Sequence, residues 1–258
     1  MQTPREKAAT LRALHVPGDP LVLPNAWDPA SARMVVAAGF PVVATSSFAT
    51  AVILGYEDGE EAPADEVLAA AARIARSVDA PLTVDFERGY ALEPAAIVER
   101  LAATGAVGVN LEDSDPPTGT MIDPAEQAAF LAAMRSSADA LGVDLVINAR
   151  TDSFLRRPAT REEQLAASLE RGKRYLAAGA DCIYPIGASD PGTVRALVEG
   201  MDAPVNIGFG RGQLSIAELA DLGAARVSFG PTLQGHLYDK FASELLSAVA
   251  AGQNPFAV

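Results

Sequence analysis

Short runs of aliphatic residues recur along the chain, each followed by a polar or Gly-rich break and an Ala/Leu-rich segment. Within the runs the apolar residues are continuous rather than alternating, which is typical of strands buried on both faces of a parallel sheet. The pattern predicts eight strands, at Leu21–Pro24, Val42–Thr45, Leu82–Asp85, Val107–Leu111, Asp144–Asn148, Asp181–Tyr184, Pro204–Ile207 and Arg226–Phe229.

The segments between these runs carry apolar residues at helical spacing. Several end in Gly just before the next strand, as in AAGF (37–40) and AAGADC (177–182), and Gly there can take the left-handed conformation that ends a helix. Three begin with Asp-Pro, which supplies a capping oxygen and a first helical Pro. Helices are therefore predicted at about Pro29–Ala38, Ala64–Val78, Glu93–Thr104, Pro124–Leu141, Arg161–Ala178, Pro191–Glu199, Ile216–Leu222 and Leu233–Ala251.

Eight strand–helix units, preceded by a helix in MQTPREKAATLRALH, predict an α/β fold of the (β/α)8 TIM-barrel type with an extra N-terminal helix. The chain has no linker, low-complexity tract or composition break, so we expect residues 1–258 to form one domain. The alternative is a doubly wound open sheet, which usually has fewer strands. Against it, LVLPNAWDP after the first strand lacks a Gly-rich phosphate-binding fingerprint.

Charge and cysteine content narrow the classes of function. The formal net charge is −13, from 33 acidic and 20 basic residues, and no run of Lys or Arg offsets it. We therefore expect neither nucleic acid nor a membrane surface as a partner. The single cysteine, Cys182, allows no internal disulfide, and the N-terminal stretch lacks the apolar core of a signal peptide. The expected location is the cytoplasm.

Acidic side chains gather where the third and fourth predicted strands end. Asp85 and Glu87 are two residues apart, so continued strand geometry would point both the same way, and Glu112 and Asp113 end the next strand. In a barrel these strand ends build the active site. Converging carboxylates repel one another unless a proton or a cation intervenes, and such oxygens suit Mg²⁺. The two histidines lie away from these ends, which disfavours zinc; the alternative is that the acids cap helices or line a solvated rim.

Two further features at the same end could hold an anionic substrate. Arg150 ends the fifth strand, and its planar guanidinium suits bidentate capture of a carboxylate, unless it forms an internal ion pair with Glu112 or Asp152. The turn after the second strand, residues 46–48, offers amides and hydroxyls, although Ser-rich turns are common.

Together these segments resemble the isocitrate lyase/phosphoenolpyruvate mutase superfamily. The similar stretches are LPNAWDPASARMVVAAGF, ATSSFATAVILGYED, PLTVDFERGYA, VGVNLEDS, INARTDSF, AGADCIYPIG and PVNIGFG. They follow the family order from about residue 20 to residue 230, and DFERGYA beside VNLED is the specific part. The resemblance implies a barrel fold and a homo-oligomer, a dimer or tetramer, whose last helix is exchanged between subunits in many members.

The resemblance also implies a metal site and its cofactor. Asp85 would bind Mg²⁺, or alternatively Mn²⁺, directly, and Glu87 and Glu112 would hold it partly through water. Asp58 follows the second strand where the family has an acidic residue near metal and substrate. Asp58, Glu112 and Arg150 are therefore the expected catalytic residues.

The implied substrate is a small 2-oxo acid or a related di- or tricarboxylate, which would react through an enolate intermediate. Its carboxylate would bind Ser46 together with the amides of Ser47 and Phe48, and Arg150 would reach the same molecule. The remaining expected substrate-binding residues are Asn206, which resembles the Asn of the family's NIT/NIG segment, and Trp27, which follows the first strand.

One departure from the family pattern bears on the reaction. Isocitrate and methylisocitrate lyases carry a K-[KR]-C-G-H loop after the fourth strand, whereas residues 112–120 read EDSDPPTGT, without Cys, Lys or His. The Lys of the phosphonate-cleaving branch is missing as well. The first hypothesis is a Mg²⁺-dependent lyase, by carbon–carbon cleavage or decarboxylation. The alternatives are phosphonopyruvate hydrolase or phosphonomutase chemistry, and a catalytically silent 2-oxo acid binding protein.

Overall fold

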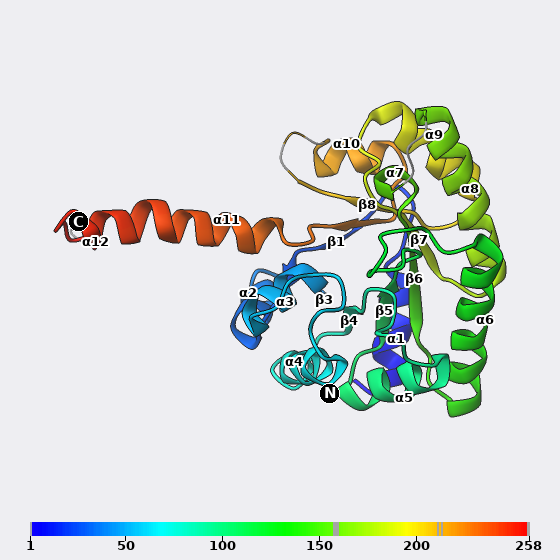
Figure 1. Cartoon of the computed structure of the whole chain (residues 1–258), viewed down its shortest axis with the longest axis horizontal. Helices are drawn as coiled ribbons and strands as arrows, with labels where there is room; N and C mark the ends of the chain where they lie inside the picture. The colour runs from blue at the N-terminus through cyan, green and yellow to red at the C-terminus, as the bar shows by residue number, and fades with distance from the viewer. Residues whose placement is uncertain (1, 157–159, 211, 213, 257–258) are drawn as a thin grey trace.

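Parallel strands close into a cylinder in the computed structural model, which describes residues 2–156, 160–210, 212 and 214–256 (Figure 1). One set of strands pairs in the order β2-β3-β4-β5-β6-β7 and the other in the order β1-β9-β8. β1 and β2 flank Pro24 as two halves of one strand, and a parallel bridge between Ile183 and Val205 joins β7 to the other set. The strands are β1 Leu21–Leu23, β2 Asn25–Ala26, β3 Val43–Thr45, β4 Leu82–Asp85, β5 Gly108–Leu111, β6 Val146–Thr151, β7 Cys182–Pro185, β8 Asn206–Gly208 and β9 Arg226–Ser228.

Helices alternate with the strands, which confirms the expected α/β barrel. The predicted Asp caps are present: Asp28 accepts from Ser31 N and Asp190 from Thr193 N. The helices are α1 Pro4–Ala13, α2 Pro29–Ala37, α3 Ser47–Leu54, α4 Ala64–Ala75, α5 Pro94–Thr104, α6 Pro124–Leu141, α7 Ser153–Arg156, α8 Arg161–Ala177, α9 Pro191–Met201, α10 Ile216–Asp221, α11 Thr232–Lys240, the π-helix η1 Phe241–Leu246 and α12 Ser247–Ala250.

Several local features of the structure differ from the sequence-based expectation or add to it, among them the short helix α7, which was not predicted. The turn predicted at residues 46–48 is the start of a helix, because Ser46 caps α3 and the apolar run after it continues as helix. β6 begins later than predicted and extends to Thr151, so Arg150 lies within the strand rather than after it. The last helix, α11 to α12, projects away from the body of the molecule (Figure 1).

The two ends of the cylinder interior differ in polarity. At the amino ends of the strands an apolar cluster includes Leu21, Leu23 and Val42, and α1 closes this end with Ala8 and Leu11. The carboxyl ends instead carry polar inward side chains. The closure requires a Gly at position 108, because a Cβ there would lie 2.7 Å from the Leu11 side chain.

A second apolar cluster packs the outer face of the strands against the surrounding helices, with Val84, Val109 and Ile147 from the strands and Leu101 and Leu131 from helices. The N-terminal helix that the sequence predicts is thus an end cap, while the other helices form the outer layer. Among the described residues no helix is long and apolar enough to cross a membrane.

Candidate active site

A cavity of about 200 Å³ opens at the carboxyl ends of the strands. Such a volume suits a metabolite rather than a large ligand. Its lining combines carboxylates, guanidiniums, hydroxyls and amides from nearly every strand end. The lining residues are Asn25, Thr45, Ser46, Ser47, Phe48, Asp58, Thr83, Asp85, Asn110, Arg150, Tyr184, Ile186, Arg226, Ser228, Gly230 and Pro231.

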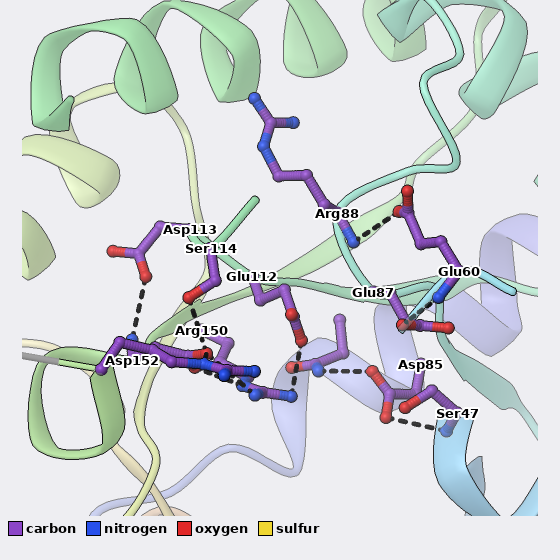
Figure 2. Close-up of polar contacts among 12 residues, drawn as sticks. Ser47, Glu60, Asp85, Glu87, Arg88, Glu112, Asp113, Ser114, Arg150 and Asp152 are labelled. Atoms are coloured by element: carbon purple, nitrogen blue, oxygen red, sulfur yellow. Dashed lines mark hydrogen bonds and ion pairs between the residues drawn. The ribbon is translucent and has the colours of Figure 1, made fainter. Parts of the chain in front are cut away.

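Asp85 is held in this cavity by hydrogen bonds from two neighbouring elements (Figure 2). The strand register places Asp85 beside Asn110, and Asn110 beside Asn148. Asn110 Nδ2 donates to Asp85 Oδ1 at 2.8 Å, and Asn148 Nδ2 donates to Asn110 Oδ1 at 2.7 Å. Ser47 N, at the start of α3, donates to Asp85 Oδ2 at 3.0 Å. These donors fix the orientation of the carboxylate.

Glu87 belongs to a loop of unusual backbone conformation. The strand ends at Asp85, and Glu87 has φ 45°, so strand alternation does not orient its side chain as the sequence had led us to expect. Tyr90 Oη donates to Glu87 Oε1 at 2.7 Å, and Glu60 N donates to Glu87 Oε2 at 2.8 Å. Burial raises the pKa of Glu87 to about 7, opposed by the Tyr90 hydrogen bond and helped by the charges of Asp58, Asp85 and Glu60.

Glu60 joins the loops after β3 and β4. Its Oε1 accepts from Arg88 N at 3.0 Å and from Tyr90 N at 2.6 Å (Figure 2 shows the contact with Arg88). The Arg88 guanidinium points elsewhere, with its central carbon 4.1 Å from the centre of the Phe130 ring. The Arg88 side chain therefore points away from Glu60 and Glu87 (Figure 2).

Arg150 is clamped between two carboxylates (Figure 2). Its Nη1 lies 2.6 Å from Glu112 Oε2, its Nε lies 2.7 Å from Asp152 Oδ1, and its Nη2 lies 3.1 Å from Asp152 Oδ2. The ion pairs considered from the sequence are thus both present, although Arg150 still lines the cavity. Burial alone would lower the pKa of Arg150, but Glu112 and Asp152 outweigh it and the pKa rises.

Carboxylates crowd this end of the barrel. Burial raises the pKa of Glu112 well above its usual value against the pull of Arg150, with the charges of Asp152 and Asp85 adding to the rise. Burial also raises the pKa of Asp58, and the charge of Asp85 adds to it. Crowded, partly desolvated carboxylates of this kind favour either a proton or a cation.

The structure brings most of the predicted site residues into one place. Ser46, Ser47, Phe48, Asp58, Asp85 and Arg150 line the cavity. Glu87 and Glu112 are not among the lining residues: Glu87 accepts from Tyr90 and Glu60, and Glu112 pairs with Arg150. Asn206 is fully buried and donates to Ser228 Oγ at 3.0 Å, so it supports the wall. Trp27 lies in a separate groove with Met34 and Leu237, between α2 and α11.

Sequence reasoning missed three strand residues whose side chains face the barrel interior. Asn110, Arg226 and Ser228 line the cavity from within β5 and β9. The two-residue repeat of a strand could have found them: Arg226 and Ser228 point inward, while Val227 between them packs in the outer core.

A divalent cation at this end of the barrel would be bound through the carboxylates of the cavity. Within the described part of the chain, no group of three or more Asp, Glu, His or Cys side chains is arranged so that it could hold a metal ion. Mg²⁺ commonly takes one or two carboxylates and keeps several waters. Asp85, the one predicted metal ligand that lines the cavity, fits a cation held in that partly hydrated way.

Comparison with known proteins identifies relatives over nearly the whole chain. The family model described as phosphoenolpyruvate phosphomutase matches residues 11–249. A crystal structure of a "putative phosphonomutase" from Burkholderia cenocepacia is 42% identical, with a TM-score of 0.89, over 93% of this chain and 99% of that one. A "Probable 2-methylisocitrate lyase 2" of Corynebacterium glutamicum is 30% identical, over 89% of this chain and 76% of the relative. An oxaloacetate decarboxylase of Rhodopseudomonas palustris is 29% identical, over 97% and 87%.

Proposed function

The chain belongs to the phosphoenolpyruvate mutase/isocitrate lyase superfamily, and from that premise we propose that it is a Mg²⁺-dependent lyase acting on a small 2-oxo acid. The proposed reaction is carbon–carbon cleavage or decarboxylation through an enolate. The observation that carries the proposal is the cavity at the strand ends, where the carboxylates of Asp58 and Asp85 lie with the guanidinium of Arg150. The superfamily relatives named as a lyase and a decarboxylase support this class of chemistry.

Asp85 would hold the metal directly, with Glu87 and Glu112 acting partly through water. When bound there, Mg²⁺, or Mn²⁺ in its place, would draw electron density from the oxygens of a 2-oxo acid and favour its enolate. Asn110 and Ser47 orient Asp85, since both donate to its carboxylate oxygens.

The carboxylate of the 2-oxo acid would lie at the start of α3. Ser46 Oγ, the amide of Phe48 and the positive end of the helix can all face it. Arg150 would approach the same molecule from β6. Because Glu112 and Asp152 hold the guanidinium from two sides, it is oriented before the ligand arrives, which reduces the entropy lost on binding.

Asp58 is the side chain best placed to handle a proton. It lines the cavity, and its raised pKa makes the protonated form more accessible than for an ordinary Asp. We assign to its Oδ the return of a proton to the carbon freed by cleavage. The 112–120 loop does not supply this group, since it contains no Cys, Lys or His, and the Thr118 hydroxyl is bonded to Asp115 and Thr120.

A second candidate is carbon–phosphorus chemistry on phosphonopyruvate. It is favoured by the 42% identity to the Burkholderia protein, and disfavoured by the missing loop Lys.

The test of both candidates is a product assay with oxaloacetate, malate-type and isocitrate-type acids and phosphonopyruvate, in Mg²⁺ and in excess chelator. Mg²⁺-dependent release of a 2-oxo acid or CO₂ supports the lyase, and release or transfer of phosphate supports the second candidate. Metal-dependent binding without any product would contradict both and favour a binding protein.

We also propose that the chain forms a homo-oligomer through its last helix. The segment from α11 to α12 projects from the body, and it carries exposed apolar side chains, among them Leu237, Phe241 and Val249. Met34 on α2, beside the base of this helix, is 70% exposed. A second copy that exchanges the helix would cover both surfaces. Sedimentation should show a dimer or tetramer, and Leu237→Asp should shift it toward monomer; a monomeric parent chain would contradict this.

A further inference from the structure

A second guanidinium, that of Arg226, reaches the cavity from the interior of the barrel. Arg226 is the first residue of β9, lines the cavity, and is only 3% exposed. Its Nε lies 3.5 Å from Ser228 Oγ, the limit of a hydrogen bond. Its Nη1 is buried and has no hydrogen-bond partner among the residues that the structure describes.

Arg226 and Arg150 differ in how their charge is balanced. Two carboxylates clamp Arg150, whereas no Asp or Glu of the described chain forms an ion pair with Arg226. Burial lowers the pKa of Arg226, and the groups that oppose this are Cys182, Tyr184 and, to a smaller extent, the carboxylate of Asp85, which forms no ion pair with it. Burial raises the pKa values of Cys182 and Tyr184 to about 12, so both are neutral at pH 7. An Arg keeps its proton under such conditions, and a buried charge without a partner is costly.

We propose that Arg226 forms an anion-binding subsite in the wall of the cavity, which binds a second negatively charged group of the substrate. The inference rests on the proposed function in taking the ligand to be a 2-oxo acid whose first carboxylate lies at α3 and Arg150. The substrate class that follows is a dianion, with a carboxylate or another acidic group at its far end.

The charges in the cavity agree with this substrate class. Two carboxylates, Asp58 and Asp85, and two guanidiniums, Arg150 and Arg226, line it. A divalent cation would balance the two carboxylates, and Glu112 and Asp152 already balance Arg150, so the charge of Arg226 is left for an acidic group of the ligand. The volume of about 200 Å³ also suits an acid of few carbons. Ser228 Oγ, held by Asn206, provides a hydroxyl beside the guanidinium.

The test compares two stable probes that share a 2-hydroxy acid head and differ in the second carboxylate, malate and lactate. Calorimetric titration of the whole chain in Mg²⁺ should show malate, in at least one enantiomer, binding at least about tenfold tighter than lactate. Arg226→Gln should bring that ratio close to one while leaving lactate binding unchanged, and Arg226→Lys should keep part of the preference. An unchanged ratio in Arg226→Gln, an equal loss for both probes, or failure of the parent chain to bind malate would overturn the proposal.

Thermal unfolding separates a ligand-binding Arg from a structural one. Because the buried charge lacks a partner, Arg226→Gln should unfold at the same temperature as the parent or higher. A marked loss of thermal stability would show that Arg226 supports the fold, and would contradict the subsite. If the parent chain turns over none of the acids tested, the proposed lyase activity is wrong. The Arg226 subsite would still be supported in that case by a malate preference that depends on Arg226.

Discussion

The two halves of the barrel interior use the same strands for opposite purposes. At the amino ends, Leu21, Leu23 and Val42 pack under α1 as ordinary apolar core. At the carboxyl ends the inward positions are Asp85, Asn110, Arg150 and similar groups that gather charge. The apolar end therefore contributes folding free energy, which offsets the free-energy cost of burying charged groups at the polar end. Substitutions in the two halves should therefore affect different measurements.

The largest expected effect is on activity, in the polar half. Asp85→Asn keeps the shape but removes the charge that would hold the metal, so kcat/KM should fall by about 10³-fold or more, roughly 4 kcal/mol. Thermal stability should stay within ~2 °C of the parent or rise, because a repelling carboxylate is lost. Asp139→Asn, an exposed Asp on α6, serves as control. Full activity in Asp85→Asn would contradict the assignment of the reaction to the polar half of the barrel.

The next effect is on stability, in the apolar half. Leu11 is fully buried beneath the strands, and Leu11→Ala should lower the free energy of unfolding by about 3 kcal/mol through the lost contacts and the cavity left behind. At temperatures where the variant is folded, its kcat/KM should equal that of the parent. Urea denaturation measures the first quantity. Arg5→Ala, exposed on the same helix, should change it by less than about 0.5 kcal/mol.

A smaller effect is expected from the residue that orients Arg150. Asp152 is fully buried and accepts two bonds from Arg150 and one from Ser114 Oγ at 2.8 Å. Asp152→Asn should raise KM for the 2-oxo acid by about 10–100-fold with a smaller change in kcat, because the guanidinium loses its orientation. Asp144→Asn removes the Arg12–Asp144 pair of 2.8 Å at the opposite end of the barrel and should leave KM unchanged. Equal effects of the two variants would contradict the positioning role.

The smallest effect concerns pH and the apolar end. His15 Nδ1 donates to Leu11 O at 2.8 Å, since a carbonyl only accepts, and Nε2 is buried without a partner in the described chain. Burial, with the charge of Arg226, lowers the pKa of His15 from 6.5 to about 4. As pH falls below 6.5 the unfolded chain therefore binds a proton that the folded chain does not, and stability is lost down to about pH 4.

His15→Gln should remove this contribution, which is about 1–2 kcal/mol at pH 5. The measurement is the free energy of unfolding of the parent and of His15→Gln at pH 7.5 and at pH 5. Because both proteins contain the same carboxylates, subtracting one pH dependence from the other removes the contribution of those groups. An identical pH dependence would show that His15 does not titrate in this way.

The sequence predicted the barrel because continuous aliphatic runs, Gly at helix ends and Asp-Pro caps each depend on local chemistry. It also indicated that Asp85 and Arg150 lie toward the carboxyl ends of the strands, where both line the cavity. It did not predict the positive φ of Glu87, which ends the strand geometry after Asp85. It failed for α3 as well, since an apolar run without helical periodicity is ambiguous. Arg226 was missed because its importance depends on partners it lacks, which only three-dimensional packing reveals.

The proposed reaction depends most directly on a divalent cation at the polar end of the barrel. Paramagnetic resonance titration of the chelator-treated chain with Mn²⁺ should show about one bound ion per chain, displaced by Mg²⁺. Asp85→Asn should lose that ion, and Asp139→Asn should keep it. Absence of bound Mn²⁺ in the parent chain, or equal binding by Asp85→Asn, would contradict the proposed site.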